Sequence, residues 1–133
     1  MSLSKDILII VETLIVFSII DFLWLGIVAR KLYQKTIGFM MADKPNLIAA
    51  VIFYVLFAIG LNIFVINSNI KSHSFNNLVL KAALFGLFSY ATFDLTSQAV
   101  FKKWPVLITV VDMLWGVVLT TLASMIIYEI NIK

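Results

Sequence analysis

Residues 7–28 read ILIIVETLIVFSIIDFLWLGIV, and this stretch decides which kind of fold the chain can adopt. A bilayer core about 30 Å thick is crossed by a helix of about 20 mostly apolar residues. Separate segments cross only as helices, because every backbone polar group must be paired internally. The stretch therefore predicts a transmembrane helix. Its length and the acids Glu12 and Asp21 favour a retained helix over a cleaved signal peptide.

Three further runs are long and apolar enough to span a membrane, at residues 46–66, 78–101 and 106–130. Pro45 and Pro105 precede the second and fourth runs, which suits the first turn of a helix because proline lacks an N–H and has a preset φ. Polar residues 67–69 and 72–74 indicate a loop between the second and third runs. We predict one all-α domain over residues 1–133, an integral membrane four-helix bundle with both termini on the same side.

Composition excludes several function classes. Of 133 residues, 62% are hydrophobic and 13% are charged, and the mean hydropathy is +1.07. A soluble domain is about 45–50% apolar and about 25% charged, and a small globule cannot bury so much apolar surface. A soluble enzyme, a disordered segment and a free nucleic-acid-binding domain are therefore excluded. The chain has no cysteine and one histidine, His73, expected in a solvated loop, so we predict no metal site and no cofactor.

Lysine and arginine counts set the predicted orientation, because short cytoplasmic loops carry an excess of these residues. The loops after the first and third runs hold six of them: Arg30, Lys31, Lys35, Lys44, Lys102 and Lys103. The other side holds four: Lys5, Lys71, Lys81 and Lys133. The count favours a plasma (inner) membrane protein with both termini outside and with loops 1–2 and 3–4 cytoplasmic.

The informative residues are three acids inside the predicted spans. A carboxylate at mid-bilayer costs about 2.5–3.5 kcal/mol on insertion scales, so such residues usually face a bundle interior or a watery cavity. Asp21 lies late in the first run, Asp94 late in the third and Asp112 early in the fourth. Because successive helices alternate in direction, all three are expected in one leaflet. Each is roughly 7 residues from the surface, so about 10 Å deep at 1.5 Å per residue.

Helical spacing places other polar and small residues on the faces of these acids. Gly86, Tyr90, Asp94 and Ser97 form one stripe, and Thr109, Asp112 and Gly116 another. A tryptophan follows two of the acids by three residues, and antiparallel D-x-x-W segments of this kind hint at an inverted repeat. The candidate transport or binding residues are Asp21, Asp94, Asp112, Tyr90, Thr96, Ser97, Trp24 and Trp115. A purely structural role, with protonated acids and packed tryptophans, is the alternative.

Two features lie away from these acids. Glu12 and Lys81 both lie in the outer-side halves of their helices. We expect them to form a structural ion pair or a contact between protomers, unless Lys81 snorkels. Residues 30–43 combine basic residues and Tyr33 with an apolar Phe39-Met40-Met41 patch. This composition predicts a short interfacial segment with its apolar side against lipid headgroups.

The run Tyr90-Ala-Thr-Phe-Asp-Leu-Thr-Ser97, then Trp104-Pro105, then Asp112-x-x-Trp-Gly116, resembles a bacterial membrane-protein family, domain of unknown function 2177. The pattern of that family is roughly Y-x-T-Y-D-L-T-N, W-P and D-x-x-W-G, with D-x-x-W-L in the first helix and a tyrosine shortly after it, as Tyr33 here. The resemblance covers nearly the whole chain. It implies a four-helix membrane protein and no established activity. Phe93 replaces a frequent tyrosine and Ser97 a frequent asparagine, so ligand contacts at these two positions are in doubt.

Three function classes stay open. We favour a small transporter or channel component, a homo-oligomer or a subunit of a membrane complex, that passes protons, a cation or a small solute through the aspartate cluster. A membrane-embedded enzyme acting on a lipid would use Asp94 and Asp112 as acid/base or metal-binding groups. An assembly subunit of a larger membrane complex would use the acids only for structure. The partners expected in every case are the lipid bilayer and other membrane proteins, not nucleic acid.

Overall fold

A computed structural model describes residues 2–132 and contains four helices long and apolar enough to cross a membrane. The first span consists of α1 (Leu3–Leu23), which continues into a π-helical segment, η1 (Trp24–Val28). A short helix follows outside the span, α2 (Arg30–Ile37), and ends in one 3₁₀ turn, η2 (Gly38–Met40). The segment 30–43, for which we predict a place at the membrane interface, thus contains α2 and η2.

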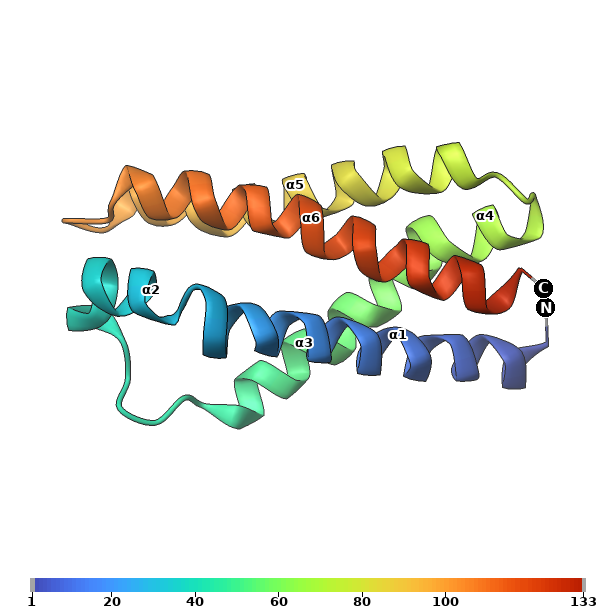
Figure 1. Cartoon of the computed structure of the whole chain (residues 1–133), viewed down its shortest axis with the longest axis horizontal. Coiled ribbons are helices and arrows are strands. Elements are labelled where there is room, and N and C mark those ends of the chain that lie inside the picture. The colour runs from blue at the N-terminus through green and yellow to red at the C-terminus, as the bar shows by residue number, and fades with distance from the viewer. Residues whose placement is uncertain (1, 133) are drawn as a thin grey trace.

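The second span is α3 (Leu47–Leu61), a second π-helical segment, η3 (Asn62–Ile66), and α4 (Asn67–Lys71). The third and fourth spans are single helices, α5 (Phe75–Val100) and α6 (Val106–Asn131). The all-α membrane bundle is confirmed, and α1 begins at the same end of the bundle at which α6 ends (Figure 1).

The loop expected at residues 67–69 is wrong, because these residues continue the second span as α4. Asn69 is buried and satisfies its polarity inside the helical structure. Its Nδ2 donates to the Val65 carbonyl at 2.7 Å, and its Oδ1 accepts from Asn77 Nδ2 at 2.8 Å. The predicted turn is confined to residues 72–74, where exposed His73 has a positive φ of 52°.

The four spans do not pack equally. The contact between α5 and α6 is the most extensive, followed by those of α1 with α6 and with α3. The second span crosses the bundle obliquely, so that η3 packs on α1, α5 and α6 while α3 makes few contacts with α5 (Figure 1). The bundle is consequently closed at the end with the chain termini and more open between α3 and α5 at the other end.

Two glycines allow the close approach of α5 and α6. A Cβ atom at Gly86 would collide with the Gly116 carbonyl oxygen and lie 2.7 Å from Thr120 Oγ1. A Cβ atom at Gly116 would collide with the Tyr90 ring. Small residues at such positions let two transmembrane backbones pack directly against each other, and here they set the spacing of the two helices that carry Asp94 and Asp112.

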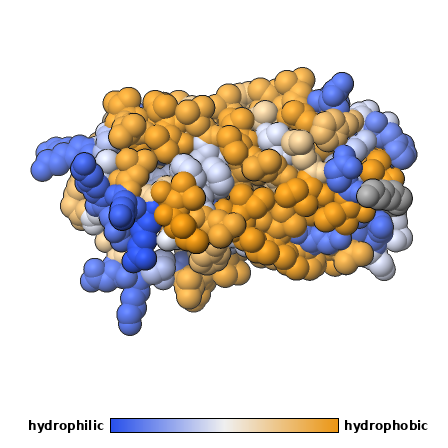
Figure 2. Space-filling view, viewed as in Figure 1, coloured by the Kyte–Doolittle hydropathy of each residue, from blue (hydrophilic) through white to orange (hydrophobic). Residues whose placement is uncertain are grey.

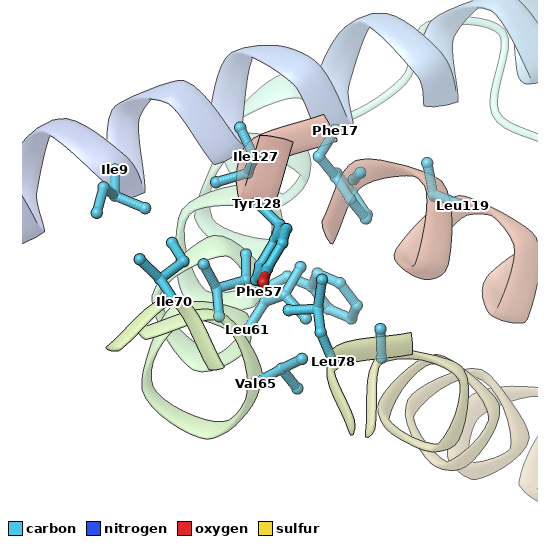
Figure 3. Close-up of a cluster of buried hydrophobic side chains, with 13 residues drawn as sticks. Ile9, Phe17, Phe57, Leu61, Val65, Ile70, Leu78, Leu119, Ile127 and Tyr128 are labelled. Atoms are coloured by element: carbon cyan, nitrogen blue, oxygen red, sulfur yellow. The ribbon is translucent and has the colours of Figure 1, made fainter. Parts of the chain in front are cut away.

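The apolar core fills the middle of the bundle and the half nearer the chain termini. Figure 3 shows how Phe17, Phe57, Leu61, Leu78 and Leu119 converge from all four spans. The outer surface is apolar around the middle of the molecule and polar at both ends (Figure 2). An apolar belt between two polar ends is the surface expected of a protein whose solvent at mid-height is lipid.

Candidate functional site

Asp21 joins three spans at the end of the bundle remote from the chain termini. It lies on the last turn of α1 with 5% of its surface exposed. Its Oδ2 accepts a hydrogen bond from the Tyr54 hydroxyl of α3 at 2.6 Å, and its Oδ1 accepts one from Trp115 Nε1 of α6 at 3.0 Å. Both carboxylate oxygens are therefore engaged by donors from other helices.

Asp112 is held by the short helix α2. Tyr33, 7% exposed, donates its hydroxyl to Asp112 Oδ1 at 2.9 Å and accepts a hydrogen bond from Trp24 Nε1 at 3.3 Å. Burial, and then the neighbouring Asp112 carboxylate, raise the pKa of Tyr33 well above its ordinary value. At neutral pH Tyr33 is therefore a neutral phenol, able to donate to Asp112 while accepting from Trp24.

The two D-x-x-W segments meet face to face. The rings of Trp24 and Trp115 stack with centroids 4.4 Å apart and planes inclined by 9°. Trp115 bonds directly to Asp21, the acid of the other segment, and Trp24 reaches Asp112 through Tyr33. The contacts are thus reciprocal between two antiparallel helices. The π-helical segment η1 begins at Trp24, and π-helical turns are frequent at functional sites.

Asp94 differs from the other two acids. It is 0% exposed, and neither of its oxygens accepts from an N–H or hydroxyl group of the described chain. The acid that faces it across the contact of α5 with α6 is Asp112. Asp94 of α5 and Asp112 of α6 are therefore facing acids on two closely packed helices, and we name them the Asp94–Asp112 pair.

A cavity of about 400 Å³ reaches this pair from the side of the bundle. Its walls come from α3, α5 and α6, and the lining residues are Phe53, Ser89, Tyr90, Phe93 and Asp112. Phe53 and Phe93 are 44% and 58% exposed within the spans. The cavity therefore opens sideways between α3 and α5, where those two helices make few contacts.

The structure brings together most of the predicted site residues. The three acids and both tryptophans form one network with Tyr33 and Tyr54, and Tyr90 lines the adjoining cavity. Ser97 is buried one turn from Asp94 on the same face. Thr96 is exposed, and its hydroxyl donates to backbone carbonyls of its own helix. Thr96 therefore lies outside the network, because two helical steps from Asp94 turn it toward the opposite face.

Two residues of the network, Tyr33 and Tyr54, are not among the candidates that the sequence predicts. Tyr33 belongs to the family pattern and to a segment for which the sequence predicts a place at the membrane surface, yet its side chain is buried in the network. Tyr54 carries the only side-chain hydroxyl group of the apolar run 47–61. A single hydroxyl group at the membrane depth of the three acids is the sequence feature that indicates a hydrogen-bond partner for one of them.

The predicted pair of Glu12 and Lys81 does not form within residues 2–132. Glu12 Oε1 instead accepts from Asn131 Nδ2 of α6 at 3.1 Å. Lys81 is exposed on α5 and lines a shallow groove with aromatic residues such as Phe64 and Phe85. α1 packs on α6 rather than on α5, which keeps the two charges on different sides of the bundle. Within the same residues, no group of three His, Asp or Glu side chains is arranged to hold a metal ion.

Residues 6–129 match the model of a family described as predicted membrane protein (DUF2177). The chain belongs to this family. The resemblance carried by Asp94, Trp104-Pro105 and Asp112 is thereby confirmed over almost the whole DUF2177 chain. No curated protein and no solved structure matches it. Because a fold alone does not define an activity, the function has to be argued from the side chains of the site.

Proposed function

We propose that this membrane protein exchanges protons for a cation at the Asp94–Asp112 pair. The observation that carries the proposal is the position of Asp94, buried and without a hydrogen-bond donor in the described chain, on the helix that packs on α6, where Asp112 lines a cavity open to the side of the bundle. Two neighbouring acids in a membrane span would retain one proton between them, because two adjacent negative charges repel, and would so bind either that proton or another positive charge.

The coupling follows from charge. A cation entering the cavity lies against Asp112 and favours ionisation of the whole pair, so the shared proton is released. By linkage, protonation of the pair weakens cation binding by the same factor. Tyr33, which does not line the cavity, holds Asp112 by a hydrogen bond, and Asp21 fixes the position of Trp115. These residues position the pair and do not exchange protons in this scheme.

A stripe of polar and small residues on α6 supports a proton route toward the other end of the bundle. Asp112, Gly116, Thr120, Ser124 and Tyr128 follow at four-residue intervals and so form a ridge that winds slowly around α6. Thr120 and Ser124 are 0% exposed, and their hydroxyl groups lack partners in the described chain. Unpartnered buried hydroxyl groups are the groups that ordered water binds, and a chain of hydroxyl groups and water conducts protons.

We also propose that two or more protomers assemble, because four short helices enclose little volume for a continuous cation route. Light scattering of the purified chain in detergent should report a mass above that of one 15.0 kDa chain plus bound detergent. A monomer that retains full flux after reconstitution would contradict the assembly and leave the exchange itself intact.

The exchange is tested in proteoliposomes. An outward cation gradient should drive proton uptake through the parent chain, recorded with a pH-sensitive dye trapped in the lumen. Asp112→Asn should lower the rate at least tenfold, because the pair loses the carboxyl that faces the cavity. Asp43→Asn, in an exposed loop, is the matched control and should behave like the parent. Equal proton flux in the parent and Asp112→Asn would overturn the proposal.

We further propose that the aspartate end of the bundle faces the cytoplasm of the cell and that the protein resides in the plasma membrane. The six basic residues at this end, against four at the other, support this orientation. The chain has no cysteine, so single cysteines report topology directly. In intact cells an impermeant maleimide should label Lys71→Cys at once and Lys103→Cys only after permeabilisation. The reverse pattern would invert the orientation.

A further inference from the structure

We infer that the cavity between α3 and α5 binds a small lipophilic ammonium ion, with its charge against Asp112 and its apolar body among the aromatic walls. The inference rests on the proposed function, because it names the class of cation that the Asp94–Asp112 pair would exchange. It is carried by the composition of the cavity walls, by the position of the single charged residue and by the direction in which the cavity opens.

The walls suit a cation that is weakly hydrated. Phe53, Tyr90 and Phe93 contribute three aromatic rings to the lining, and ring faces attract cations, most strongly where water is excluded. Oxygen atoms are few, since only Ser89, Tyr90 and Asp112 supply them. A hard metal cation requires about six oxygen ligands, so this lining replaces the hydration shell of an inorganic ion poorly. An organic ammonium ion needs only one counter-charge and apolar contact.

The charge at the inner end of the cavity is a single carboxylate backed by a second acid. Asp112 lines the cavity, and Asp94 behind it is 0% exposed with both oxygens unpartnered by donors of the described chain. A ligand that brings positive charge to Asp112 would satisfy the charge of the pair. An anionic or neutral ligand would leave the buried carboxylate uncompensated, which is costly in an apolar setting.

The route of entry and the size of the ligand follow from the geometry. Phe53 and Phe93 at the rim are exposed within the spans, so a ligand arrives from the bilayer and not from the aqueous end of the bundle. Sites for small molecules commonly measure about 300–1,000 Å³, and about 400 Å³ places this cavity at the small end. It accommodates one ring or a short chain with an ammonium head, but not a whole two-chain lipid.

Binding to the purified full chain in a neutral detergent tests the inference. Benzyltrimethylammonium, titrated by calorimetry, should bind saturably, and neopentylbenzene, its uncharged isostere, should bind at least tenfold more weakly. Phe93→Ala should weaken benzyltrimethylammonium binding about fivefold or more, because the variant lacks one of the aromatic rings that line the cavity. Phe101→Ala is the matched control, since Phe101 is similarly exposed but does not line the cavity. Asp112→Asn should abolish binding, with its helical circular dichroism spectrum as the check on folding.

Equal binding of the charged and neutral compounds, or full binding by Phe93→Ala, would overturn the inference. The ammonium headgroup of a lipid is a second possible occupant, and competition in nanodiscs of phosphatidylglycerol distinguishes it from a small free ammonium ion. Added phosphatidylethanolamine should not displace the probe. Displacement would assign the cavity to a lipid headgroup instead. Failure of this inference is separable from failure of the exchange. Proton flux driven by sodium or potassium without ammonium binding overturns only the cation class, and ammonium binding without any flux overturns only transport.

Discussion

Replacing Gly86 with alanine should destabilise the bundle by about 2 kcal/mol or more, within the range known for overpacked interiors. The added methyl group would overlap the Gly116 carbonyl oxygen, which is backbone and has no rotamer through which to move away. Relief is possible only if α5 and α6 separate. Since α5 carries Asp94 and α6 carries Asp112, the separation should also move the two acids apart and lower proton flux together with stability.

Reversible unfolding in mixed micelles with increasing SDS measures the stability effect. Two other glycines provide controls inside spans. A Cβ atom at Gly60 meets only Phe85 Cζ at 3.4 Å, an ordinary contact, and one at Gly26 meets nothing within 4 Å. Gly60→Ala and Gly26→Ala should therefore unfold within about 0.5 kcal/mol of the parent, as substitutions away from special features do. A Gly86→Ala chain as stable as these controls would show that α5 and α6 are not in direct backbone contact.

The spans could be predicted from the sequence because the bilayer imposes one requirement on all of them, about 20 apolar residues each. The common depth of Asp21, Asp94 and Asp112 also followed, since depth depends only on position along alternating helices. Their lateral arrangement did not follow. Asp94 meets Asp112 because Gly86 and Gly116 bring α5 and α6 together, whereas Asp21 is tied to the others only through aromatic side chains.

The network depends on residues whose role is invisible without tertiary contacts. Tyr33 lies among mostly polar neighbours in α2, a helix of eight residues. This short helix folds back on the bundle, so that the Tyr33 hydroxyl reaches Asp112, which is 79 positions away in the sequence. Tyr54 reaches Asp21 across the α1–α3 contact. Helical phase, by contrast, already contained the reason that Thr96 points away while Ser97 is buried. Local periodicity therefore predicts which face is buried, and packing decides which partner it meets.

Asp94→Asn should separate cation binding from proton release: the variant should still bind the cation but should release no proton on binding it. In the parent, the shared proton competes with the cation, so the apparent affinity for the cation should rise with pH, by up to about tenfold per unit if one proton is exchanged. Asparagine can donate an N–H to Asp112 in place of the shared proton, which preserves the fold and leaves one carboxylate facing the cavity. The variant should bind the cation with an affinity independent of pH and should show no proton-coupled flux.

The charged and titratable groups around the pair make Asp94 the decisive position. Tyr33 from α2 remains a neutral donor, Tyr90 lines the cavity from α5, and Asp21 on α1 already accepts from Tyr54 and Trp115. None of these groups can supply the exchanged proton as readily as the Asp94 carboxyl, whose oxygens accept from no N–H or hydroxyl group of the described chain. Proton release per bound benzyltrimethylammonium, measured by calorimetry in buffers of different ionisation enthalpy, should be positive in the parent and in Asp43→Asn and zero in Asp94→Asn. Release that persists in Asp94→Asn would place the exchanged proton on another group and refute the carboxyl pair as the coupling site.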